Sequence, residues 1–81
     1  MEGYPIKYDY SELRGLIRAK YGTTAAFARA IGKSECSVSK KLNGHSEWTA
    51  TDMRRTCTAL GLSPNSIPRL FFTPKVENSQ Q

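Results

Sequence analysis

The chain has 81 residues, enough for one small domain with a modest hydrophobic core and too few for two domains. Hydrophobic residues make up 38% of it, so the composition favours a folded domain over disorder. The sequence contains no apolar run long enough to cross a bilayer, and its first residues, MEGYPIKYDY, lack the apolar core of a secretory signal. We therefore expect a cytoplasmic protein that contacts no membrane.

The net charge of +5 favours a polyanionic partner only weakly, because many small basic proteins bind no nucleic acid. Cys36 and Cys57 are expected to be free thiols in a reducing compartment. A zinc site would need more ligands than these two cysteines and the single histidine, His45, can supply. No metal or other cofactor is therefore expected. The sequence also lacks a nucleophile with its base and a phosphate loop, so it does not predict an enzyme.

The first predicted helix begins near Asp9 and ends at Gly22. Asp9 and Glu12 have the spacing of a capping box. Gly15 weakens the helix by about 1 kcal/mol relative to alanine. Apolar residues recur at three- and four-residue steps, which indicates one buried stripe. These residues are Tyr10, Leu13, Leu16, Ile17 and Tyr21.

Two short helices are expected next, joined by a tight turn at Gly32, which can take a positive φ. The first begins at Thr23 or Thr24, either of which can cap it. Its buried face consists of Phe27, Ala28 and Ile31.

The second short helix is capped by Ser34 and runs from Glu35 to about Leu42. Val38 and Leu42 are its clear apolar positions, so it has little reason to form for packing alone. Four cations, namely Arg29, Lys33, Lys40 and Lys41, outnumber Glu35 in residues 29–45 and give this stretch a net charge of +3.

A fourth helix begins at Thr49, which has box-like spacing to Asp52, and a short irregular fifth follows Ser63 and Pro64. Trp48 is expected to fold back onto the core. Leu70, Phe71 and Phe72 either close the core or form a self-association surface, and the two interpretations are compatible. The sequence thus predicts an all-α bundle of about five short helices over residues 8–72. An arm (1–7) and a flexible tail (73–81) flank it.

Residues 23–44, TTAAFARAIGKSECSVSKKLNG, resemble the helix-turn-helix of the lambda-repressor-like superfamily, which includes phage Cro proteins and repressors. In that pattern Ala28 lets the two helices cross closely, Gly32 makes the turn and Val38 packs between the helices. With the flanking YDYSELRGLIRAKYG and LFFTPKV, the chain is similar to small Cro-like regulators of phages of Gram-positive bacteria. That resemblance implies the cytoplasm of a bacterial host.

The resemblance also implies that the third helix lies in the major groove of DNA. Carried over position by position, it makes candidate base readers of Ser34, Glu35, Cys36, Ser37 and Lys40. Candidate contacts to the DNA backbone are Thr24, Lys33, Lys41, Asn43 and His45. Lys40 can donate to guanine and Glu35 can accept from cytosine, but no base sequence follows. The charge on the motif predicts salt-sensitive binding.

The leading hypothesis from the sequence is a sequence-specific DNA-binding regulator, a Cro-like repressor that occupies double-stranded operator DNA. Members of the superfamily usually bind as homodimers, with half-sites about 34 Å apart. We place the dimer contact at Leu70, Phe71 and Phe72. The alternative is a protein-interaction module, an antirepressor or modulator that binds another repressor. An antitoxin is a third possibility, although no toxin-binding extension is evident.

Overall fold

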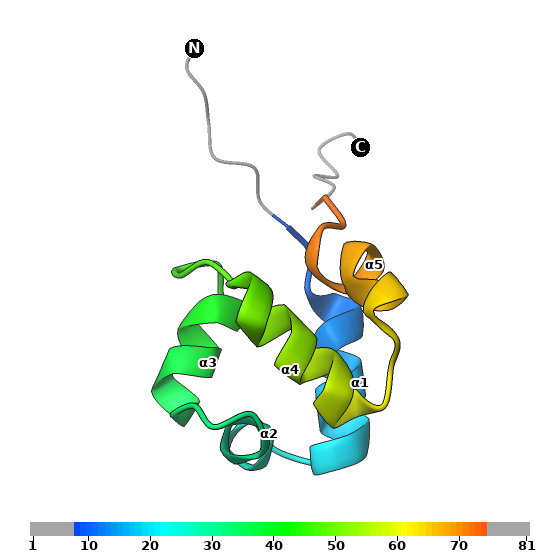
Figure 1. Cartoon of the computed structure of the whole chain (residues 1–81). Coiled ribbons are helices and arrows are strands. Elements are labelled where there is room, and N and C mark those ends of the chain that lie inside the picture. The colour runs from blue at the N-terminus through cyan, green and yellow to red at the C-terminus, as the bar shows by residue number, and fades with distance from the viewer. Residues whose placement is uncertain (1–7, 75–81) are drawn as a thin grey trace.

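A computed structural model describes residues 8–74 of the chain (Figure 1). Within that range, five α-helices and one 3-10 turn follow one another, which confirms the predicted all-α bundle. The elements are α1 (Ser11–Tyr21), α2 (Thr24–Ala30), α3 (Glu35–Leu42), α4 (Ala50–Leu60), η1 (Pro64–Ser66) and α5 (Ile67–Phe71). The predicted arm (1–7) and the tail beyond Pro74 lie outside the described residues.

The predicted capping box at the start of α1 is wrong. The helix begins at Ser11, and Asp9 accepts hydrogen bonds from the backbone N–H (2.9 Å) and the hydroxyl of that residue. The Glu12 carboxylate instead pairs with Arg69 of α5, at 2.8 Å from its Nε. Asp9 and Glu12 have the spacing of a capping box, but the Glu12 carboxylate forms an ion pair with another helix instead.

The other predicted helix starts are present. Thr23, rather than Thr24, caps α2 by accepting from the N–H of Ala26. Thr49 and Asp52 form a complete capping box at α4, in which each side chain accepts from the other residue's backbone N–H. These caps fix where the connecting loops enter the helices.

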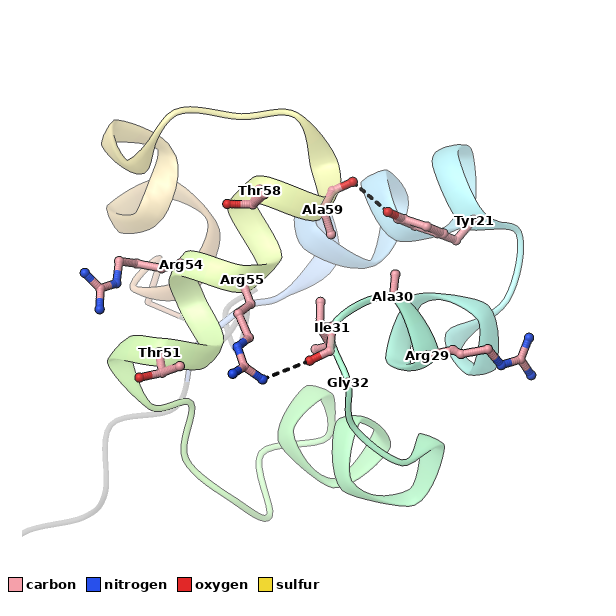
Figure 2. A pocket seen from close by; sticks show the side chains of 10 residues that line it. All are labelled: Tyr21, Arg29, Ala30, Ile31, Gly32, Thr51, Arg54, Arg55, Thr58 and Ala59. Atoms are coloured by element: carbon pink, nitrogen blue, oxygen red, sulfur yellow. Dashed lines mark hydrogen bonds between the residues drawn. The ribbon is translucent and has the colours of Figure 1, made fainter.

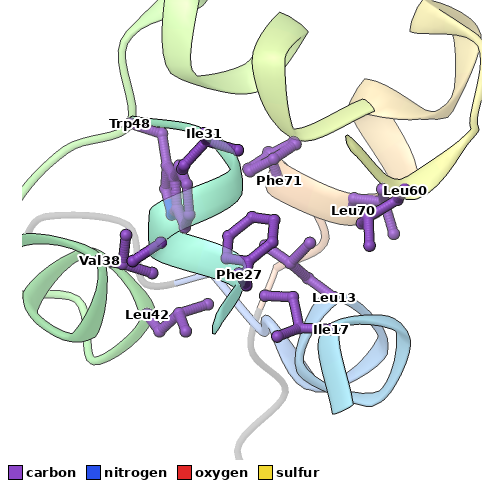
Figure 3. Packing of buried hydrophobic residues seen from close by; sticks show 11 residues of the cluster. Leu13, Ile17, Phe27, Ile31, Val38, Leu42, Trp48, Leu60, Leu70 and Phe71 are labelled. Atoms are coloured by element: carbon purple, nitrogen blue, oxygen red, sulfur yellow. The ribbon is translucent and has the colours of Figure 1, made fainter. Parts of the chain in front are cut away.

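The core is formed by all five described α-helices, with Phe27 near its centre and Leu60 contributed by α4 (Figure 3). Trp48 is buried there as predicted, with its ring edge-on to Phe71 at 4.9 Å between centroids. Leu70 and Phe71 are fully buried, so they close the core, while Phe72 is 45% exposed. Of the three residues assigned to a dimer contact, only Phe72 offers a large apolar surface.

The described ends of the chain lie side by side. The N–H of Asp9 donates to the carbonyl of Thr73 at 2.7 Å, and Tyr8 forms an antiparallel bridge with Pro74. The rings of Tyr8 and Phe72 meet edge to face. Thr73 and Pro74 therefore belong to the folded unit, although the sequence placed them in the tail.

Candidate functional site

The segment from α2 to α3 has the tight turn expected from the sequence. Gly32 adopts φ +75°, which lets the N–H of Lys33 reach back to the carbonyl of Ala28 at 2.9 Å. Ala28 and Val38 are both buried, so the two helices pack closely at these positions. The packing leaves the polar side of α3 on the surface.

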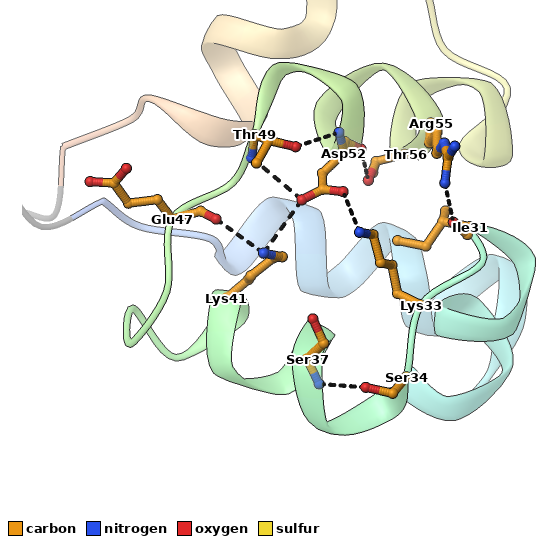
Figure 4. A network of polar contacts seen from close by, with 10 residues as sticks. All are labelled: Ile31, Lys33, Ser34, Ser37, Lys41, Glu47, Thr49, Asp52, Arg55 and Thr56. Carbon is orange, nitrogen blue, oxygen red and sulfur yellow. Dashed lines mark hydrogen bonds and ion pairs between the residues drawn. The ribbon is translucent and has the colours of Figure 1, made fainter.

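The predicted base readers lie at the start and on the outer side of α3. Ser34, Glu35, Cys36 and Lys40 are exposed, and Ser37 is half-buried. Ser34 caps the helix by accepting from the N–H of Ser37 at 3.1 Å (Figure 4). Cys36 and Lys40 stand four residues apart and are therefore neighbours on the helix surface.

Lys33 and Lys41, expected at DNA phosphates, are both directed toward the buried carboxylate of Asp52 (Figure 4). Their Nζ atoms lie 3.6 and 3.4 Å from its two oxygens. Lys41 also donates to the carbonyl of Glu47 at 3.1 Å, and its side chain is only 13% exposed. A phosphate contact by Lys41 would first have to break this arrangement.

The same contacts set the ionisation of Asp52. Burial alone would raise its pKa, but hydrogen bonds from Thr49 and the ammonium groups of Lys33 and Lys41 outweigh burial and lower the pKa. The sequence pointed to Asp52 only as a cap, because contacts to a residue far along the chain leave no periodic signal.

Asn43 is also engaged within the protein. Arg14 of α1 donates from Nη2 to the side-chain oxygen of Asn43 and to the carbonyl of Leu42, both at 2.8 Å. Arg55 of α4 donates to the carbonyl of Ile31 at 3.3 Å. Two arginines thus satisfy carbonyls at the ends of α2 and α3. The sequence analysis did not predict these contacts.

The two remaining predicted residues flank α3. Thr24 is half-buried at the start of α2 and lines a shallow hollow with Arg14 and Arg18. His45 is exposed, and its backbone N–H donates to the carbonyl of Lys40 at 2.8 Å. In residues 8–74, Lys40 is the one predicted lysine that no ion pair engages.

Within the described part of the chain, no three side chains that ligate metals lie together. Cys36 is exposed, whereas Cys57 is buried, and burial raises the pKa of the Cys57 thiol. None of the described helices has both the length and the apolar character that crossing a membrane requires.

Comparison with known proteins places the chain in a family. Residues 6–74 match the family described as "Protein of unknown function (DUF739)". The chain belongs to this family. No curated protein matches it.

A solved structure similar to this one is the solution structure of the modulator of repression (MOR) of the temperate bacteriophage TP901-1 from Lactococcus lactis. It is 44% identical, with a TM-score of 0.73 over 86% of this chain and 95% of that protein. Family and likeness together support a role in phage regulation. Membership of the lambda-repressor-like superfamily and a Cro-like activity stay predictions.

Proposed function

We propose that this protein modulates repression in a temperate phage by binding a repressor protein. The observation that supports this most strongly is the 44% identity to a phage modulator of repression, spread over 95% of that protein's length. Of the hypotheses drawn from the sequence, this favours the interaction module over the autonomous repressor.

The electrostatics of α3 favour a protein partner over DNA. Affinity for DNA comes largely from cations that neutralise phosphates. Here Lys33 and Lys41 face Asp52, Asn43 is held by Arg14, and Glu35 adds a negative charge in the first turn. Lys40 alone offers a free ammonium on this helix.

Specific DNA binding is the second candidate, and one observation favours it. Ser34 caps α3 outside the core, so the first turn of the helix is open to a major groove. In this candidate Lys40 supplies a base contact and the chain acts as a homodimer on an operator.

Two measurements separate the candidates. Titration calorimetry with the repressor encoded beside this protein should show saturable binding. A gel shift with the neighbouring promoter DNA should show no specific complex of this protein alone. A sequence-specific shift that Lys40→Ala abolishes and Lys20→Ala preserves, without binding to the repressor, would refute the proposal in favour of the second candidate.

A further inference from the structure

A groove lies between the end of α2 and the outer face of α4 (Figure 2). Its volume is about 700 Å³, and it is open along its outer side. It shares no residue with the set predicted to contact DNA. Such an open shape suits a segment of a macromolecule better than an enclosed small molecule.

One wall of the groove is a continuous stripe of α4. Thr51, Arg54, Arg55 and Thr58 recur at three- and four-residue steps, which places them on one face of the helix. All four are exposed in the described structure. This face of α4 therefore takes no part in the core.

Arginines stand at both ends and in the middle of the groove. Figure 2 shows the guanidinium groups of Arg54 and Arg29 at opposite ends, directed away from each other, with Arg55 between them, where it binds the carbonyl of Ile31. Arg29 and Arg54 are exposed, and within residues 8–74 neither has an ion-pair partner.

The groove between the arginines is partly apolar. Ala30, Ile31 and Ala59 line it, and Tyr21 closes one side with its hydroxyl donating to the carbonyl of Ala59 at 2.7 Å. No acidic residue is among the described residues that line it. Its middle thus combines apolar side chains with the guanidinium of Arg55, and a further arginine stands at each end.

We propose that this α2–α4 groove is the docking site for an acidic amphipathic helix of the repressor, an inference that rests on the proposed function. The apolar face of such a helix covers Ala30 and Ala59, which are at least partly exposed, whereas Ile31 is buried in the core. Carboxylates toward its two ends accept bidentate hydrogen bonds from Arg29 and Arg54. A DNA backbone would match the arginines but leave the two alanines uncovered, so the groove favours a protein segment.

Calorimetry with the purified repressor tests this site through two kinds of variant of the full chain. Arg54→Glu reverses one charge at the groove, and its matched control, Arg18→Glu, reverses an exposed charge on α1. Thr58→Trp fills the groove without changing charge, and its control, Ala19→Trp, adds the same bulk on α1. Circular dichroism verifies that each variant is folded.

We expect both groove variants to weaken repressor binding by at least about tenfold, and both controls to stay within about twofold of wild type. Binding of the groove variants with wild-type affinity would overturn the docking site and leave the proposed function standing. No binding of the wild-type protein to the repressor would overturn the proposed function and the site with it.

Discussion

Asp52 of α4 contacts both the turn that follows α2 and helix α3. It completes the cap of α4 and places a negative charge between Lys33, in the turn after α2, and Lys41, near the end of α3. Its side chain is 3% exposed, so these contacts are poorly screened by water. Through Lys41, this carboxylate links α3 directly to α4.

Replacing Asp52 with asparagine should lower the free energy of unfolding by about 2 kcal/mol, because two ammonium groups lose their counter-charge while the shape of the cap is kept. Urea denaturation at neutral pH measures the change. Glu35→Gln, which removes an exposed carboxylate from α3, should change stability by less than about 0.5 kcal/mol. Equal effects of the two substitutions would refute the special role of Asp52.

The same carboxylate predicts a dependence on pH. The pKa of Asp52 is lower in the folded protein than in the unfolded chain, so its stabilisation is complete above the unfolded value of about 3.9 and is lost as pH falls through the folded value. The stability difference between wild type and Asp52→Asn should thus be constant near neutrality and shrink below about pH 4. Denaturation curves at stepped pH test this. If the stability difference between wild type and Asp52→Asn stayed constant as pH fell to the pKa of Asp52 in the folded protein, this prediction would be contradicted.

Helix α3 has only Val38 and Leu42 in the core, so its attachment depends on polar contacts with other helices. Arg14 supplies one of them at the C-terminal end of α3. Arg14→Met should destabilise the protein by about 1 kcal/mol and increase amide exchange in α3 more than in α1. Arg18→Met, one turn further along α1, is the control and should leave exchange in α3 unchanged. If Arg14→Met accelerated amide exchange equally in all helices, Arg14 would not anchor α3 in particular.

Helix α1 contains a glycine whose replacement should stabilise the fold. A Cβ built on Gly15 meets nothing within 4 Å, so alanine gains helix propensity without a clash. Gly15→Ala should raise the free energy of unfolding by about 0.5–1 kcal/mol in thermal or urea denaturation.

Gly32→Ala is the contrast for that substitution, because Gly32 has φ +75° and a side chain there costs about 1–2 kcal/mol. A loss of stability with Gly15→Ala would show that α1 differs from the helix described. No loss with Gly32→Ala would show that the turn after α2 differs from the one described.

Across the molecule, the sequence predicted what depends on neighbours along the chain. Periodic apolar residues located the helices, and short polar spacings located the caps at Ser34 and Thr49. The contacts it missed join residues far apart, as between Arg14 and Asn43 or Lys41 and Asp52. No local pattern reveals such pairs, because they exist only once the helices pack. They also decide which of the lysines predicted to contact DNA are free of ion pairs.

The predicted homodimer contact also depends on how the helices pack. The sequence left open whether Leu70 and Phe71 close the core or form a self-association surface, and in the structure both are buried in the core. Phe72 and its neighbour Tyr8 give too little apolar area for a stable interface by themselves. The homodimer stays a prediction, and a dimer would need other surfaces besides this one.

The central claim is that the partner of this protein is a repressor rather than operator DNA. Amide NMR spectra of the labelled protein, titrated separately with the repressor and with operator DNA, test it directly. The account predicts saturable shifts with the repressor, centred on Arg29, Arg54 and Thr58, and only weak shifts with DNA that disappear at about 0.3 M salt. Saturable shifts in α3 on addition of operator DNA but not of unrelated DNA, with none on addition of the repressor, would contradict it.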